Sequence, residues 1–129
     1  MSGSNKDGSP SKDTLDRIKN IAIAVKFKKF SLANEAEAEY SIIQTYDDEY
    51  KIVIHFLNMG QEYMDEIDRF FQLDVAPWLI KQPEAFTFGL HQNPEWPDKL
   101  DFILAPISKF RAQLLTEEIV TRLQKKFGR

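Results

Sequence analysis

The chain has 129 residues, of which 43% are hydrophobic and 29% are charged, a balance typical of one globular domain with a single core. Its formal net charge is −3, so a broadly basic surface for nucleic acid is not expected. The absence of cysteine excludes disulfides, thiolate nucleophiles and Cys-ligated metals.

The first 13 residues are almost entirely polar or glycine, so they have too few apolar side chains to offset the entropy of ordering. We expect a disordered tail over residues 1–13 and a single domain over residues 14–129. No run approaches the roughly 18 apolar residues of a membrane helix, and the N-terminus lacks the apolar core of a secretory signal. We therefore expect a cytoplasmic protein with no membrane partner.

Residues 14–32 carry two overlapping patterns. Helical spacing is shared by Leu15, Ile18, Ile21, Ala22 and Val25, and strand alternation by Ile21, Ile23, Val25 and Phe27. We interpret the region as a short helix over about residues 14–24, followed by a strand to about residue 32. The next stretch, ANEAEAE, indicates an acidic turn or a weak helix.

Two β-branched and aromatic runs, YSIIQTY and YKIVIHFL, predict a hairpin closed by the DDE at residues 47–49. In the second run, alternation puts two sets of three side chains on opposite faces. One face carries Ile52, Ile54 and Phe56, and the other carries Val53, His55 and Leu57. Since both faces are largely apolar, this is either a central strand or a strand with one face toward a partner.

A helix is expected after Asn58, which can cap it. Pro77 should interrupt that helix, either by ending it or by beginning a second short turn, PWLIKQ, before Pro83 stops it. Its apolar stripe is Tyr63, Ile67, Phe70 and Phe71. The runs AFTFGL and LDFIL then predict two strands joined by the long loop HQNPEWPDK. In that loop Trp96 either folds back over the hydrophobic edge or stands out as an anchor.

The last segment predicts a helix from Ser108 to Phe127, with Gly128 as its stop. Its apolar stripe is expected to contain Phe110, Leu114, Leu115, Ile119, Leu123 and Phe127. The whole order is helix, three strands, helix, two strands, helix. It predicts an α+β fold in which an antiparallel sheet of about five strands is packed by three helices.

This order of elements, over about residues 14–127, resembles that of the type III secretion effector chaperones and their YbjN-like relatives. The resemblance implies a dimeric protein that binds extended polypeptide along apolar patches. It concerns topology alone, so no functional residue is carried over. Small bacterial immunity proteins are equally compatible in size and acidity, and fold-level likeness does not decide function.

Catalytic and metal-binding patterns are sparse. Glu62, Asp65 and Glu66 fit a solvated helix face, and His55 and His91 lie about 36 residues apart without any metal-ligand spacing. No nucleophile elbow or phosphate-binding glycine loop is present. We therefore expect no enzyme activity, no metal and no cofactor, with acid–base chemistry by His91 and Glu95 as the enzymatic alternative.

Binding is the remaining function class. The KFKKF stretch at residues 26–30 interleaves lysine with aromatic residues and could bind single-stranded nucleic acid, although the acidic total argues against it. We instead expect a non-enzymatic protein-binding module of chaperone, adaptor or inhibitor type, acting through an apolar sheet or groove, with another protein or a second copy as partner. The candidate partner-binding residues are Val53, His55, Leu57, His91 and Trp96.

Overall fold

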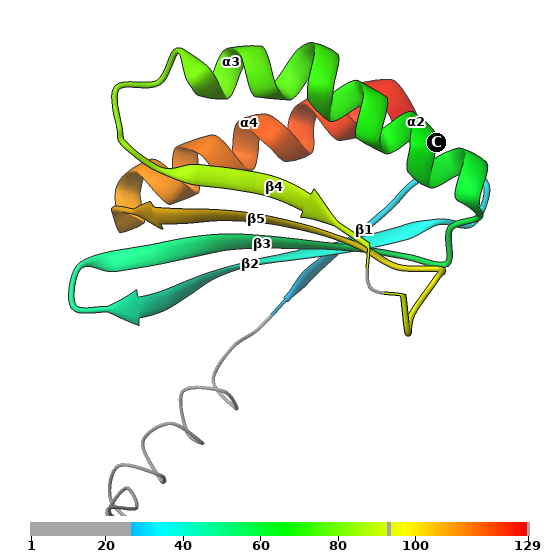
Figure 1. Cartoon of the computed structure of the whole chain (residues 1–129), viewed down its shortest axis with the longest axis horizontal. Helices are drawn as coiled ribbons and strands as arrows, with labels where there is room; N and C mark the ends of the chain where they lie inside the picture. The colour runs from blue at the N-terminus through cyan, green and yellow to red at the C-terminus, as the bar shows by residue number, and fades with distance from the viewer. Residues whose placement is uncertain (1–26, 93, 129) are drawn as a thin grey trace, which may run out of the picture.

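The computed structural model describes residues 27–92 and 94–128. Within this part, five antiparallel strands form one sheet in the order β1-β2-β3-β5-β4, and the helices lie together over one face of it (Figure 1). The strands are β1 (Lys28–Ser31), β2 (Glu37–Tyr46), β3 (Glu49–Leu57), β4 (Thr87–His91) and β5 (Leu100–Ile107). The helical segments are α2 (Gln61–Phe70), η1 (Phe71–Val75), α3 (Ala76–Ile80) and α4 (Lys109–Phe127).

The predicted α+β class and five-stranded antiparallel sheet are confirmed. The expected disordered tail over residues 1–13 and the helix over residues 14–24 lie outside the described residues. Two helical segments, the continuous α2-η1-α3 segment and α4, are therefore described where three helices were expected.

The acidic stretch before the first hairpin divides into a turn and a strand. Asn34 and Glu35 take left-handed backbone angles in the turn, and β2 begins at Glu37. The expectation of an acidic turn or weak helix throughout is wrong for its second half. Ala36 and Ala38 are fully buried, so the alternation of alanine with glutamate is a strand pattern with its small residues toward the core.

The core lies between the sheet and the helices. Ile54 of β3 stands opposite Tyr40 of β2 and Phe102 of β5, so the third strand in sequence is also central in the sheet. Phe71 bridges the layers, because its ring centroid lies 6.0 Å from that of Phe56 and 4.9 Å from that of Phe102. The expected division of β3 into two faces is confirmed by this register.

The helix after β3 begins at a different cap residue from the one expected. Gly60, not Asn58, is its N-cap residue, because Asn58 takes a positive φ in the preceding turn. Pro77 lies at the start of α3, in agreement with the expectation that it begins a second short turn, but the backbone remains helical from α2 through η1 to α3. The Ala76 N–H donates to the carbonyl of Phe71, five residues back, and this wide turn leaves Pro77 in the first turn of α3, where its missing N–H costs little.

The final helix starts and stops where the sequence predicts. The Ser108 hydroxyl accepts a hydrogen bond from the Arg111 N–H, and Gly128 follows the last turn. The predicted apolar stripe is too wide, however: Phe110 is 66% exposed and Leu114 is 42% exposed. The side of α4 that packs on the sheet is formed by Ala112, Leu115, Thr116, Ile119, Leu123 and Phe127.

Candidate functional site

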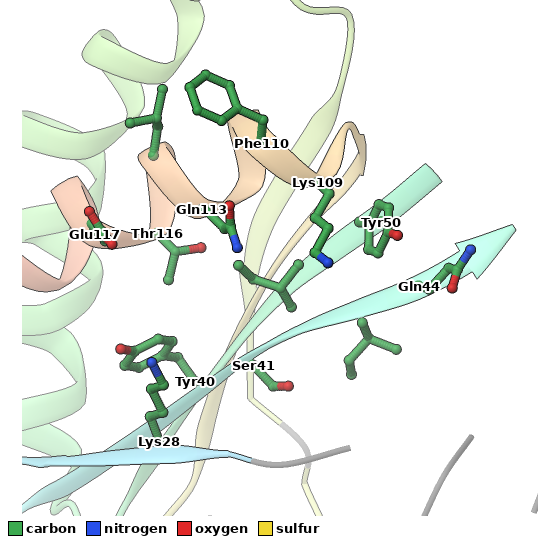
Figure 2. Close-up of a pocket in the computed structure, with 13 residues that line it drawn as sticks. Lys28, Tyr40, Ser41, Gln44, Tyr50, Lys109, Phe110, Gln113, Thr116 and Glu117 are labelled. Carbon is green, nitrogen blue, oxygen red and sulfur yellow. The ribbon is translucent and has the colours of Figure 1, made fainter. Parts of the chain in front are cut away.

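A groove of about 740 Å³ lies between the first half of α4 and the helix-facing side of β2 (Figure 2). Among the described residues, no strand lies beside β2 on this side beyond the point where β1 begins. Residues of β1, β2, β3 and α4 contribute to its walls. The groove therefore joins segments far apart in sequence.

The floor of the groove is apolar. Tyr40 and Ile42 point to the helix side of β2, opposite Ile54 and Ile52 of β3, and both are half-buried. Tyr50 extends this floor along β3. These side chains belong to the core face of the sheet, but α4 does not cover them completely. They are apolar surface that a bound segment could remove from water.

The α4 wall is polar inside the groove and apolar at its rim. Figure 2 shows Lys109 and Gln113 extending from α4 toward the strands, whereas Phe110 points away from them. Phe110 and Leu114 are both substantially exposed and line the outer part of the groove. Fully burying one such side chain contributes roughly 1.5–3 kcal/mol, so this rim is a favourable contact point for a partner.

Two lysines give the groove a positive character. Lys28 stands beside Tyr40 at one end, and Lys109 extends from the start of α4 (Figure 2). Neither forms an ion pair within residues 27–92 and 94–128. Glu117 contributes the one acidic side chain to the groove lining. Negative groups on a ligand would therefore be favoured near both lysines.

Thr116 is one of two buried polar residues that line the groove, with Ser41. It is 1% exposed, and its hydroxyl has no hydrogen-bond partner among the described residues. An unmade hydrogen bond at a buried hydroxyl costs free energy. Its hydroxyl is closed to solvent, which places it beneath the groove wall and not on the binding surface.

Four of the five predicted partner-binding residues lie on the other face of the sheet, away from the helices. Val53, His55 and Leu57 alternate with the core residues of β3, and His91 stands opposite Asp101 on the same face. His55 Nδ1 is 2.6 Å from Asp101 Oδ1. The structure thus brings these residues onto one surface, but Val53 is 5% exposed and offers little apolar area.

This open face carries a row of charged and ionisable residues that crosses all five strands. Each member is in register with the next: Lys29, Glu39, His55, Asp101 and His91. Lys29 and Glu39 are opposite charges, and each histidine stands next to a carboxylate, an arrangement that stabilises strand pairing modestly. The row makes this part of the face polar.

Trp96, the fifth predicted residue, lies in the loop between β4 and β5. Its ring is 52% exposed, and Lys99 Nζ lies 4.5 Å from the ring centroid. The Gln92 side chain donates to the Pro97 carbonyl at 3.1 Å and ties the loop to itself. Trp96 is thus an exposed ring partly covered by a lysine, and it does not fold back as a buried lid.

The lysines of the KFKKF stretch do not form one patch within the described residues. Lys28 faces the groove, and Lys29 stands opposite Glu39 on the open face, because neighbouring residues of a strand alternate sides. Phe30 is half-buried and packs on Tyr40, with ring centroids 6.0 Å apart. Lys26 lies outside the described residues.

No group of three or more histidine, aspartate or glutamate side chains in the described ranges is arranged to hold a metal ion. Nor is any helix in this part of the chain both long and apolar enough to cross a membrane.

Comparison of the chain with protein-family models, with curated proteins and with solved structures finds no match in any of the three.

Sequence reasoning missed the groove because it assigned Phe110 and Leu114 to the core stripe of α4. A signal was present, however. At about 100° per residue, Phe110 lies on roughly the opposite side of the helix from Ile119, which is fully buried. The two residues therefore could not both face the sheet.

Proposed function

We propose that this protein is a non-enzymatic protein-binding module, of the chaperone, adaptor or inhibitor type, that holds a segment of another protein in the groove between β2 and α4. The observation that carries the proposal is the incompletely covered apolar floor beside the exposed rim residues Phe110 and Leu114. Exposed aromatic and aliphatic side chains around a concave surface favour binding of a partner.

Substitution of the rim tests this function. A Phe110→Glu, Leu114→Glu double variant should fold normally, because both side chains are exposed, and should lose proteins that the wild-type chain retains from a native lysate. Ile80→Glu is a matched control, since Ile80 is 74% exposed at the end of α3, outside the groove lining. Retention of the same proteins by all three chains would rule out the groove as the binding site.

A second copy of the chain is a partner of the same kind. Size-exclusion chromatography with light scattering separates this case from binding of a different protein. A dimer that dissociates in the rim variant and persists in Ile80→Glu would identify the occupant as a second copy. A monomer that retains lysate proteins through the rim would identify it as a different protein.

A further inference from the structure

The groove contains a free strand edge. β2 has ten residues, but β1 pairs with only the four from Glu37 to Tyr40. Within the described residues, the rest of β2 has no strand partner on that side. A bulge between Gln44 and Tyr46 interrupts the register with β3, so the regular part of the free edge is residues 41–44.

Apart from its short length and the bulge that ends it, this edge lacks the features that usually protect such edges. Its sequence, Ser-Ile-Ile-Gln, contains no lysine and no proline, which commonly prevent unwanted strand pairing. Half of the backbone N–H and C=O groups of an edge strand point away from its one partner. Within the described residues, this side of residues 41–44 therefore has backbone groups without a strand partner, although Ser41 itself is only 7% exposed.

The edge and the groove are adjacent. The side chains of Ser41 and Ile43 stand opposite Val53 and Lys51 on the open face, yet both residues also line the groove, which they reach through their backbone. Figure 2 shows Lys109 and Gln113 facing this side of β2 from α4. A chain placed beside residues 41–44 would thus have α4 above one of its faces.

We propose that the partner enters as an extended segment that pairs with residues 41–44 of β2, with acidic side chains toward the groove and apolar side chains toward the open face. This inference rests on the proposed function and specifies its binding mode. Four paired residues span about 13 Å, which is a short strand of the kind that adds to sheet edges in peptide recognition.

The charges determine which side of the incoming strand is acidic. Side chains toward the groove would lie near Lys28 and Lys109, which form no ion pair within the described residues. Side chains on the other face would lie next to Ile43, where apolar groups are favoured. An alternation of acidic and apolar residues satisfies both sides, since successive side chains of a strand point to opposite faces.

The same charges argue for a partner segment over the residues that precede β1. A strand that continued the β1 register by two residues would put Lys26 opposite Ile42 and bring a third lysine to the groove side. Like charges at this spacing repel. An acidic segment from a partner is the complementary occupant.

The first test is amide hydrogen exchange of the free full-length chain, followed by NMR. Outward-pointing amides of residues 41–44 should exchange much faster than amides of β3, which is paired on both sides. Slow exchange at these amides in the free chain would mean that the edge is already paired, and would overturn the proposal.

The second test uses blocked octapeptides as probes. An alternating valine–glutamate peptide should bind and slow exchange at residues 41–44, whereas a valine–lysine peptide should not. A valine–glutamate peptide with every second backbone nitrogen methylated should bind about tenfold more weakly or worse, because it loses strand hydrogen bonds. Equal binding of the methylated and unmethylated peptides would overturn strand addition.

A charge-reversed chain completes the test. In a Lys28→Glu, Lys109→Glu variant the preference should change to the valine–lysine peptide, and in a Lys125→Glu, Lys126→Glu control it should not. An unchanged preference in the first variant would overturn the assigned orientation.

The two proposals fail separately. If the rim variant loses its lysate partners but no probe protects residues 41–44, strand addition is wrong and the groove remains the binding site. If no probe protects residues 41–44 and the rim variant keeps its lysate partners, both strand addition and the groove as binding site are wrong.

Discussion

At the scale of single residues, Tyr63 is the group most affected by its surroundings. Its half-buried ring packs on Phe127, with centroids 5.8 Å apart, and its hydroxyl has no hydrogen-bond partner among the described residues. Burial raises the pKa of Tyr63, and the nearby Glu66 carboxylate raises it further. The fold therefore favours the neutral phenol.

Tyr63→Phe should increase the free energy of unfolding by roughly 1 kcal/mol at neutral pH, because it removes an unpaired buried hydroxyl and keeps the ring. Since the pKa of Tyr63 is higher in the folded state, wild-type stability should be fully present below pH of about 10 and decline as the pH rises through the raised value. The variant should lack this part of the alkaline decline.

Urea denaturation at neutral and alkaline pH measures both effects. Tyr46→Phe is the matched control, because Tyr46 is 69% exposed and its hydroxyl is hydrated in both states. Equal alkaline losses in wild type and Tyr63→Phe would show that Tyr63 does not contribute.

At the scale of elements, the start of α4 positions the groove wall. The Arg111 N–H to Ser108 Oγ distance is 3.4 Å, which is long for a capping hydrogen bond. Ser108→Ala should therefore lower the free energy of unfolding by about 0.5 kcal/mol, at the low end for such a cap, and Ser108→Asp should preserve it. Urea denaturation of both variants checks this, and a lower stability of Ser108→Asp than of Ser108→Ala would contradict it.

The elements with strict alternation or helical spacing could be predicted from the sequence. β5 follows a period of two over most of its length because one face of it is in the core, and the buried side of α2 repeats every three or four residues. β3 was recognisable by its β-branched and aromatic residues, although Ile52, Val53 and Ile54 are all buried. The passage of the helix through Pro77 could not be predicted, because it depends on a wide turn that local sequence preference does not indicate.

The candidate site was less accessible to sequence reasoning. Alternation correctly assigned Val53, His55 and Leu57 to one face. It could not show that a row of charged and ionisable residues crosses that face, because the register depends on contacts between strands that are distant in sequence. The groove depends on where α4 lies above β2, which is likewise a property of the assembled layers.

At the scale of the whole molecule, the aromatic side chains join the sheet to the helices. Phe71 contacts Phe56 and Phe102 of the sheet and Phe70 of α2. Phe71→Ala should cost about 3–5 kcal/mol, a large fraction of the roughly 5–15 kcal/mol that stabilises a typical domain. Phe71→Leu should cost less, because it fills more of the cavity.

Thermal unfolding followed by circular dichroism tests this. Leu73→Ala, two residues further along and 67% exposed, is the control and should change stability by less than about 0.5 kcal/mol. A similar midpoint for Phe71→Ala and Leu73→Ala would contradict the central role of Phe71.

The wide turn of η1 also determines which side chains of α3 face the sheet. Phe71, Val75 and Leu79 are all buried, yet a spacing of four residues drifts by about 40° per step around a regular α-helix. A turn closed over five residues winds more slowly and offsets this drift, so all three side chains stay on the sheet side. The five residues of η1 thus keep α3 oriented with Leu79 toward the sheet. Removal of one of them would rotate α3 about its own axis and move Leu79 out of the core.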